Sequence, residues 1–253
     1  MTRLLLILHF TGLVMAFAAT FAIFLERAFE QVRNSVARQD LNVKLLGSHA
    51  GIHTGEDGSS AQAIEDIAIY RALPNMKIVV PADAVEAEQA TIAAAQIPGP
   101  FYIRVNRNET DVVYEDGCRF ELGRGSVLRD GRAAAVIACG TLVGEALAAA
   151  AALERDGIDV RVVNMSSIKP LDADLVVACA EETGLVVTAE DHNVIGGLGS
   201  AVAEVLCERC PARLVRIGMQ DRFGDSGDPA GLYRKYGLDA ARIADRVRRE
   251  LGG

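Results

Sequence analysis

The segment from Gly47 to Gly58 carries the side chains best suited to chemistry. It reads Gly-Ser-His-Ala-Gly-Ile-His-Thr-Gly-Glu-Asp-Gly, so two imidazoles and two adjacent carboxylates lie among four glycines. Glycine lets the backbone approach a ligand closely, and His and Asp exchange hydrogen bonds with a hydroxylated or carbonyl substrate. The alternative interpretation is a surface turn rich in glycine and polar residues.

The elements around this segment predict its position in a fold. The apolar run at 41–46 indicates a strand, so the segment lies at a strand's carboxyl end, where open α/β sheets bind ligands. We expect one helix from Phe21 to Arg38 and another from Ser60 to Ala72, capped by Ser59 or Ser60. Further elements are expected at 76–80 (strand), from Pro81-Ala-Asp83 onwards (helix) and at 101–105 (strand). This alternation predicts a parallel sheet covered on both faces.

The stretch from Thr110 to Gly131 is charged and contains glycine, so we expect a domain boundary there, with a possible hairpin. A second series of alternating strands and helices follows it. The expected strands are 133–138, 159–163, 185–189 and 213–217, and the expected helices are 142–156, 172–183, 198–207 and 239–251.

Composition limits the possible functions. The chain has 253 residues and a formal net charge of −8, with 34 acidic against 26 basic side chains, which argues against general nucleic-acid binding. Five irregularly spaced cysteines favour a reducing compartment, and we expect a cytoplasmic protein. Cys207 and Cys210 form a C-x-x-C without a second pair or a nearby histidine, so we do not assign them a zinc or redox role.

The amino terminus is unusually apolar. The 22 residues from Leu4 to Leu25 carry no charge, so by length they could span a membrane or act as a signal anchor. His9, Thr11, Gly12 and Thr20 dilute the run. We expect it to pack against the sheet or a partner chain, and a lone chain exposing it to aggregate.

Several motifs, in this order, resemble the transketolase family, and most closely the C-terminal subunit of split, two-chain transketolases. They are Thr20-Phe-Ala-Ile-Phe24, the segment 47–58, Ala63-Ile-Glu-Asp-Ile-Ala68, Pro74-Asn-Met76, Val80-Pro-Ala-Asp83, Glu190-Asp-His-Asn193, Gly196-Gly-Leu-Gly199 and Asp221-Arg-Phe-Gly-Asp-Ser-Gly227. The resemblance implies two parallel-sheet α/β domains: an N-terminally truncated pyrimidine-binding domain at 1–112 and the transketolase C-terminal domain at 117–253.

The resemblance also implies site residues. Phe21 and Phe24 match the aromatic positions that pack on the aminopyrimidine ring of thiamine diphosphate, where a flat apolar face suits a heteroaromatic ring. His49 and Asp57 match positions that bind sugar hydroxyls, and Arg107 matches the arginine that binds the sugar phosphate. Two Phe residues three apart on a helix are also compatible with a core role, but the resemblance favours the cofactor role.

Other residues in this region have less defined roles. Arg104 could share the role of Arg107, His53 stands where the family usually has no imidazole, and Glu56 is interpreted as ordering the loop. Glu190-Asp-His-Asn193 precedes a predicted helix start, which could bind an anion. In the family this domain supports dimer packing without a direct catalytic role, so His192 is expected to be structural or at an interface.

The chain departs from the family pattern in three ways. Ala61 stands where the family has a second histidine, near the reacting carbon. The glutamate that protonates the pyrimidine is expected upstream of the first residue, and Glu26 and Glu30 are on the wrong side of Phe21 to replace it. The diphosphate signature is also missing, since neither Asp57-Gly58 nor the Asp-Gly at 130–131 has its context.

We therefore expect a partner-dependent subunit. An N-terminal transketolase subunit would hold Mg²⁺ and the diphosphate, thiamine diphosphate would be shared between the chains, and self-association would give a heterotetramer acting on sugar phosphates. Three alternatives stay open: the β subunit of a 2-oxoacid dehydrogenase, a non-catalytic truncated chain or assembly protein, and 1-deoxyxylulose-5-phosphate synthase-like chemistry. His49, Asp57 and Arg107 favour sugar phosphates over short oxoacids.

Overall fold

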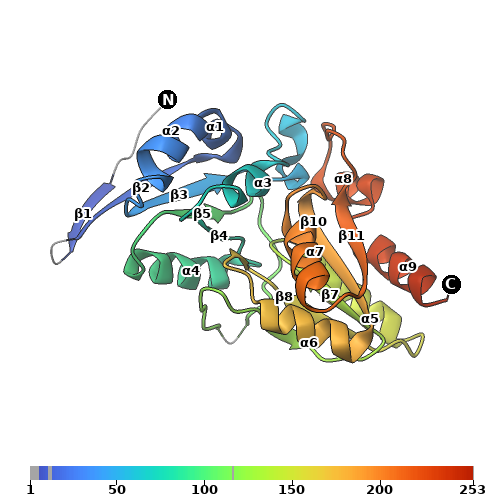
Figure 1. Ribbon diagram of the computed structural model, residues 1–253. Coiled ribbons are helices and arrows are strands. Elements are labelled where there is room, and N and C mark those ends of the chain that lie inside the picture. The colour runs from blue at the N-terminus through green and yellow to red at the C-terminus, as the bar shows by residue number, and fades with distance from the viewer. Residues whose placement is uncertain (1–5, 11–12, 116, 253) are drawn as a thin grey trace.

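A computed structural model describes residues 6–10, 13–115 and 117–252, which form two α/β units side by side (Figure 1). Within this part of the chain the first sheet has the order β1-β2-β3-β5-β4-β9 and the second has the order β11-β10-β7-β8-β6. The strands are β1 (Leu6–Phe10), β2 (Leu13–Phe21), β3 (Val43–Ser48), β4 (Lys77–Val79), β5 (Phe101–Arg104), β6 (Ser126–Arg129), β7 (Ala134–Ala138), β8 (Val160–Asn164), β9 (Ser167–Lys169), β10 (Leu185–Asn193) and β11 (Arg213–Met219).

Helices cover both sheets. In the first unit α1 and α2 lie on the opposite side of the sheet from α4, and in the second α5 packs against α9 while α6 packs against α7 (Figure 1). The helices are α1 (Ala22–Arg27), α2 (Phe29–Val32), the π-helix η1 (Arg33–Ala37), the 3₁₀ helix η2 (Ile52–Asp57), α3 (Asp66–Arg71), α4 (Ala84–Gln96), α5 (Leu142–Glu154), α6 (Ala173–Thr183), α7 (Leu198–Arg209), α8 (Pro229–Tyr236) and α9 (Ala240–Leu251).

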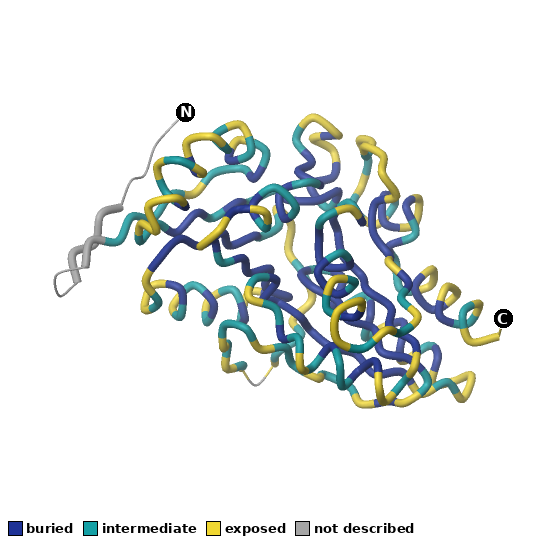
Figure 2. Tube along the Cα trace, viewed as in Figure 1, coloured by how far each residue is buried: buried dark blue, intermediate teal, exposed yellow. Residues whose placement is uncertain are grey.

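The core follows the two-residue period of the strands. Along β7, Ala134, Val136 and Ala138 face one cluster, whereas Ala135 and Ile137 face the other. The first cluster receives α5, α8 and α9, and the second receives α6 and α7. The second cluster also contains side chains of β3, α3 and β4, so apolar side chains of both units pack together in it. Figure 2 shows buried stretches of chain in both units.

The strand register positions the candidate site. The strands β2, β3 and β5 are parallel neighbours, with Thr20 opposite Gly47 and Gly47 opposite Arg104. Their carboxyl ends therefore lie together at one edge of the first sheet, and the loop that follows each strand starts there. This edge is where the predicted ligand-binding segment lies.

The predicted two-domain α/β fold is confirmed, although each sheet is mixed rather than wholly parallel. The strands β1, β9 and β6 pair antiparallel with their neighbours. The possible hairpin in the 110–131 stretch is wrong, because β6 pairs with the distant β8. The strand β9 was not predicted. It comes from the second half of the chain but completes the first sheet beside β4.

The predicted helix from Ser60 to Ala72 begins later than expected. Helix α3 starts at Asp66, and Ser59 and Ser60 are exposed turn residues that cap nothing. Other segments take the backbone carbonyl groups that an earlier start would need, because the Gly51 N–H donates to the Ala63 oxygen and the Asn193 N–H to the Ile64 oxygen. These tertiary contacts override the local helix signal.

The predicted helix from Phe21 to Arg38 is also divided. Thr20 and Phe21 end strand β2, and the helical stretch is interrupted at Ala28 before it closes in a π-helix. Part of the apolar amino terminus, residues 1–5 and 11–12, lies outside the described residues. Among the described residues there is no helix with both the length and the apolar character needed to cross a bilayer.

Candidate active site

The glycine-rich loop, defined here as Gly47–Gly58, lies beside the aromatic residues predicted to face a cofactor. The ring of Phe21 stacks on the imidazole of His49, with 3.7 Å between centroids and 12° between planes. Phe21 also stacks on Phe24 at 5.4 Å and 11°. Phe24 is 58% exposed, which leaves an apolar ring available at this edge of the sheet. The three parallel rings form a surface suited to a flat heteroaromatic group.

Asp57 and Arg107 meet at the other end of the same loop. Their side chains form an ion pair of 3.0 Å between Arg107 Nη1 and Asp57 Oδ1, and both are about one-third exposed. The same nitrogen donates to the Thr54 carbonyl at 3.2 Å. Because these contacts use Nη1, the guanidinium keeps N–H groups on Nη2 and Nε for an anionic ligand.

His49 has two features that separate it from an ordinary surface histidine. Its φ of 56° lies in the left-handed region, which is uncommon for a residue with a side chain and concentrates at functional sites. Burial lowers the pKa of His49, the positive charge of Arg107 lowers it further, and the negative charge of Asp57 opposes both. A neutral imidazole can both donate and accept a hydrogen bond.

The structure thus brings Phe21, Phe24, His49, Asp57 and Arg107 together at the carboxyl ends of β2, β3 and β5. Arg104, which we considered as a partner of Arg107, does not belong to this group. Its side chain is only 3% exposed and pairs with the fully buried Asp66, with 2.7 Å between Nε and Oδ2. The interpretation of Arg104 as a phosphate ligand was therefore wrong, because the guanidinium is already committed to a carboxylate.

The buried Asp66 is the centre of a polar cluster below the loop. It accepts hydrogen bonds from the Tyr102 hydroxyl at 2.6 Å and from Arg104 Nε. Arg104 Nη2 donates to the Ala63 carbonyl and, at 2.8 Å, to the carbonyl of Asp191 in the second unit. One guanidinium therefore joins helix α3, the segment just before that helix and strand β10.

Two features near the loop were not predicted from sequence. The carboxylate of Asp191 accepts the backbone N–H groups of Ile52 and His53, at 2.9 and 3.1 Å, and the hydroxyl of Tyr233, at 3.1 Å. The side chain of Gln62, in the turn after the loop, donates a hydrogen bond of 2.9 Å to the Asp225 carbonyl in the second unit. The only sequence signal for Asp191 was its place in the Glu190-Asp-His-Asn193 motif at a predicted strand end.

The start of α7, which the sequence suggested could bind an anion, is occupied by a carboxylate of the chain itself. Glu190 accepts the N–H groups of Leu198 and Gly199 at 2.7 and 2.8 Å. Burial raises the pKa of Glu190 to about 7, and the two amides oppose that shift. A Cβ on Gly197 would lie 1.9 Å from Glu190 Oε2, so glycine is required there for the carboxylate to approach.

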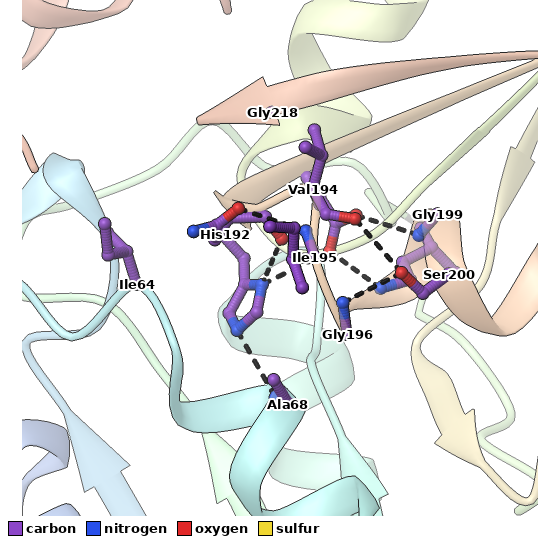
Figure 3. A network of polar contacts seen from close by, with 12 residues as sticks. Ile64, Ala68, His192, Val194, Ile195, Gly196, Gly199, Ser200 and Gly218 are labelled. Carbon is purple, nitrogen blue, oxygen red and sulfur yellow. Dashed lines mark hydrogen bonds and ion pairs between the residues drawn. The ribbon is translucent and has the colours of Figure 1, made fainter. Parts of the chain in front are cut away.

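His192 is structural, as expected from the motif. It is fully buried, its Nδ1 lies 2.6 Å from the Asn193 carbonyl, and its Nε2 lies 3.4 Å from the N–H of Ala68 on α3 (Figure 3). Because Nε2 must accept from that amide, the proton is on Nδ1. Desolvation lowers the pKa of His192 to about 4, so the ring is neutral at physiological pH.

We expect the stability advantage of the wild type over His192→Gln to shrink as the pH falls from 6.5 towards 4. In this window the unfolded chain protonates His192 and the folded chain does not, so acid favours unfolding of the wild type by about 1.4 kcal/mol per pH unit. Urea unfolding of both proteins at several pH values measures the difference. The comparison with the variant is needed because the raised pKa of Glu190 makes acid stabilise the folded chain, which is the opposite effect. Both proteins contain Glu190, so the difference between them isolates His192. A constant difference across this range would contradict the assignment.

Four further residues singled out from sequence are not among the residues that form the ring stack or the Asp57–Arg107 pair. The ring of His53 is half-buried and lies 5.5 Å from that of Tyr233, and burial lowers its pKa. Glu56 is exposed, and Ala61 lies in a turn. Cys207 is exposed on α7. Among the described residues no cluster of His, Cys, Asp and Glu could hold a metal ion.

The fold and site agree with the comparisons to known proteins. Residues 8–112 match the family model of the transketolase pyrimidine-binding domain, and residues 123–243 match that of the transketolase C-terminal domain. The chain is 44% identical over 239 residues to a putative transketolase C-terminal section of Methanocaldococcus jannaschii, covering 93% of this chain and 75% of that protein. This chain therefore belongs to the transketolase family, as its motifs predicted.

Two further comparisons show how much of a transketolase this chain represents. It is 40% identical to the transketolase-like protein 1 of Bos taurus over 95% of its own length but spans only 40% of that protein. Among solved structures it resembles a split-gene transketolase described as an inactive beta4 tetramer, with a TM-score of 0.88, 49% identity and coverage of 93% of this chain and 76% of that one. The family's pyrimidine-binding domain implies use of thiamine diphosphate.

Proposed function

We propose that this chain is the C-terminal subunit of a two-chain transketolase, which transfers a two-carbon ketol unit between sugar phosphates. One observation carries the proposal: the Phe21–Phe24–His49 stack and the Asp57–Arg107 pair lie at the two ends of one loop, at the carboxyl edge of a parallel set of strands. An aromatic surface beside a polar, cationic one suits a heteroaromatic cofactor next to a phosphorylated sugar.

The residues present fit the aromatic part of thiamine diphosphate. Phe24, exposed and parallel to Phe21, offers a face for the aminopyrimidine ring. When bound, the cofactor would supply a thiazolium ring as the electron sink for cleavage of a ketose. His49 and Asp57 would hold sugar hydroxyls, and Arg107 would hold the phosphate and so orient the substrate.

The remainder of the site is proposed to come from an N-terminal transketolase subunit. That partner would hold the diphosphate and Mg²⁺, so the cofactor is shared between the chains and two copies of each form a heterotetramer. The likeness to a C-terminal section and to a split-gene beta4 tetramer supports both partner dependence and self-association. We also propose that the pyrimidine-binding domain ends near residue 112 and that the second domain begins near residue 117. Among the described residues the cysteines form no disulfide, which supports the proposal of a cytoplasmic location.

A second candidate function, a non-catalytic assembly chain, is favoured by one observation. Ala61 stands where the resemblance calls for a histidine and carries no group that could handle a proton or a hydroxyl. This candidate predicts that the chain binds its partner but adds no turnover. The substrate test below separates the two functions, since it requires a site in which Arg107 contacts substrate.

In the assembled enzyme, Arg107→Ala is expected to lower kcat/KM for phosphorylated substrates by about ten- to a hundredfold, because it removes a charge-assisted contact with the phosphate worth about 1.5–3 kcal/mol. Unphosphorylated analogues should change far less. Arg209→Ala is the matched control, since Arg209 also forms an exposed ion pair, with Asp174, but lies on α7 away from the loop. Equal losses for both substrate classes would assign Arg107 to structure instead.

A further inference from the structure

The second domain reaches the glycine-rich loop through one buried carboxylate. Asp191, at the carboxyl end of β10, is 2% exposed, and its hydrogen bonds from Ile52, His53 and Tyr233 all come from outside its own strand. Two of them come from the backbone of η2, the helical turn between His49 and Asp57. The carboxylate thus fixes the middle of the loop whose two ends carry the candidate site.

The loop also leaves space for the Asp191 carboxylate, because a glycine lies where the two are closest. Gly51 has a φ of 73°, and a Cβ there would lie 2.2 Å from Asp191 Oδ2. A side chain at this position would therefore displace either the loop or the carboxylate. Thr54, one turn further on, returns its hydroxyl to the His49 carbonyl at 2.8 Å, so the turn held by Asp191 is bonded back to His49.

The bonding continues from Asp191 into the second domain. The Tyr233 hydroxyl, on α8, lies 2.6 Å from the Thr141 hydroxyl at the start of α5. Arg104, paired with Asp66, contacts the carbonyl of Asp191 from the first domain. The position of the carboxylate is therefore set from both sides, as a positioning group requires.

We propose that Asp191 is a positioning residue for substrate binding, through which the second domain sets the conformation of the glycine-rich loop and the separation of His49 and Asp57. The assignment of the loop to a sugar-phosphate substrate rests on the proposed function. The positioning role rests on the contacts alone. It gives the C-terminal domain a part in the active site, beyond the dimer packing that the family resemblance implies.

Hydrogen exchange of the purified full-length chain tests the positioning role without any activity. In Asp191→Asn, an NH₂ group replaces one acceptor oxygen, so either the Ile52 amide, which uses Oδ1, or the His53 amide, which uses Oδ2, loses its acceptor and the turn is loosened. We expect exchange of the Ile52 and His53 amides to accelerate at least tenfold, while strand amides at 186–189 keep their protection. Tyr233→Phe, which removes one of the three bonds, should produce the same pattern with a smaller increase, of about threefold.

The neighbouring Glu190 provides the matched control. It is also a buried carboxylate bonded to two backbone amides, but those amides, of Leu198 and Gly199, belong to its own domain. Glu190→Gln should accelerate exchange at those two positions and leave the loop protected. Unchanged loop exchange in Asp191→Asn, or an equal loss of protection throughout the chain, would overturn the positioning role.

Kinetics of the assembled two-chain enzyme supply the second readout. Asp191→Asn should raise KM for a phosphorylated ketose about tenfold and change kcat less than threefold, because the groups that bind substrate are displaced. Glu190→Gln should leave KM unchanged, as a purely structural substitution would. A wild-type KM in Asp191→Asn would contradict the proposal. If the wild-type assembly transfers no ketol unit, the proposed function fails, while the exchange experiment still decides the role of Asp191.

Discussion

Replacing Asp66 by alanine is expected to lower the free energy of unfolding by about 3–5 kcal/mol, a large part of the stability of a domain. The change leaves the Arg104 guanidinium, 3% exposed, without its counter-ion and removes the acceptor of the Tyr102 hydroxyl. Charges in such a place are tolerated when paired and strongly unfavourable when alone. Chemical denaturation of the purified variant measures the loss.

Two further variants make this expectation specific to the buried pair. Asp245→Ala breaks an exposed Asp–Arg pair with Arg248 and should cost less than about 1 kcal/mol. The double variant Asp66→Leu/Arg104→Met removes both charges and should recover much of the loss, because the interior then holds no unpaired ion. A loss below 1 kcal/mol in Asp66→Ala would show that Arg104 finds another partner or water.

The elements predicted best are those whose signals are local. Helix α4 begins after Asp83, whose side chain accepts the N–H of Glu86, as the Pro81-Ala-Asp83 start predicted. In the second domain, β7, α5, β8 and α6 fall within a few residues of their expected bounds, because apolar period and turn residues agree there. The five candidate site residues could be named from the sequence because they lie in segments that resemble the family, and their roles in binding stay a prediction.

The elements predicted poorly depend on distant contacts. The start of α3 is displaced because the backbone of Ala63 and Ile64 is bonded to the loop and to Asn193. Arg104, at the end of the strand expected at 101–105, was interpreted as able to share the role of Arg107, yet it pairs with Asp66, 38 positions earlier. Asp191 accepts a hydrogen bond from Ile52, which lies 139 positions earlier in the chain. A contact between residues so far apart in the sequence cannot be predicted from a local pattern.

The purified chain alone is expected to show no ketol transfer and to bind thiamine diphosphate weakly. Its described surface offers an aromatic face and the partly exposed Arg107, but among the described residues there is no cluster that could hold Mg²⁺. Diphosphate groups need cations or backbone nests for tight binding. Addition of the N-terminal subunit should therefore raise ketol transfer from none to full turnover.

Reconstitution tests the two-subunit account most directly. The chain, the N-terminal transketolase subunit and their mixture are each assayed with Mg²⁺, thiamine diphosphate, xylulose 5-phosphate and an aldose phosphate. The account predicts no turnover by either subunit alone and turnover by the mixture that saturates at equimolar subunits. Turnover by this chain without its partner would contradict the account, and so would a mixture that forms a stable complex but remains inactive.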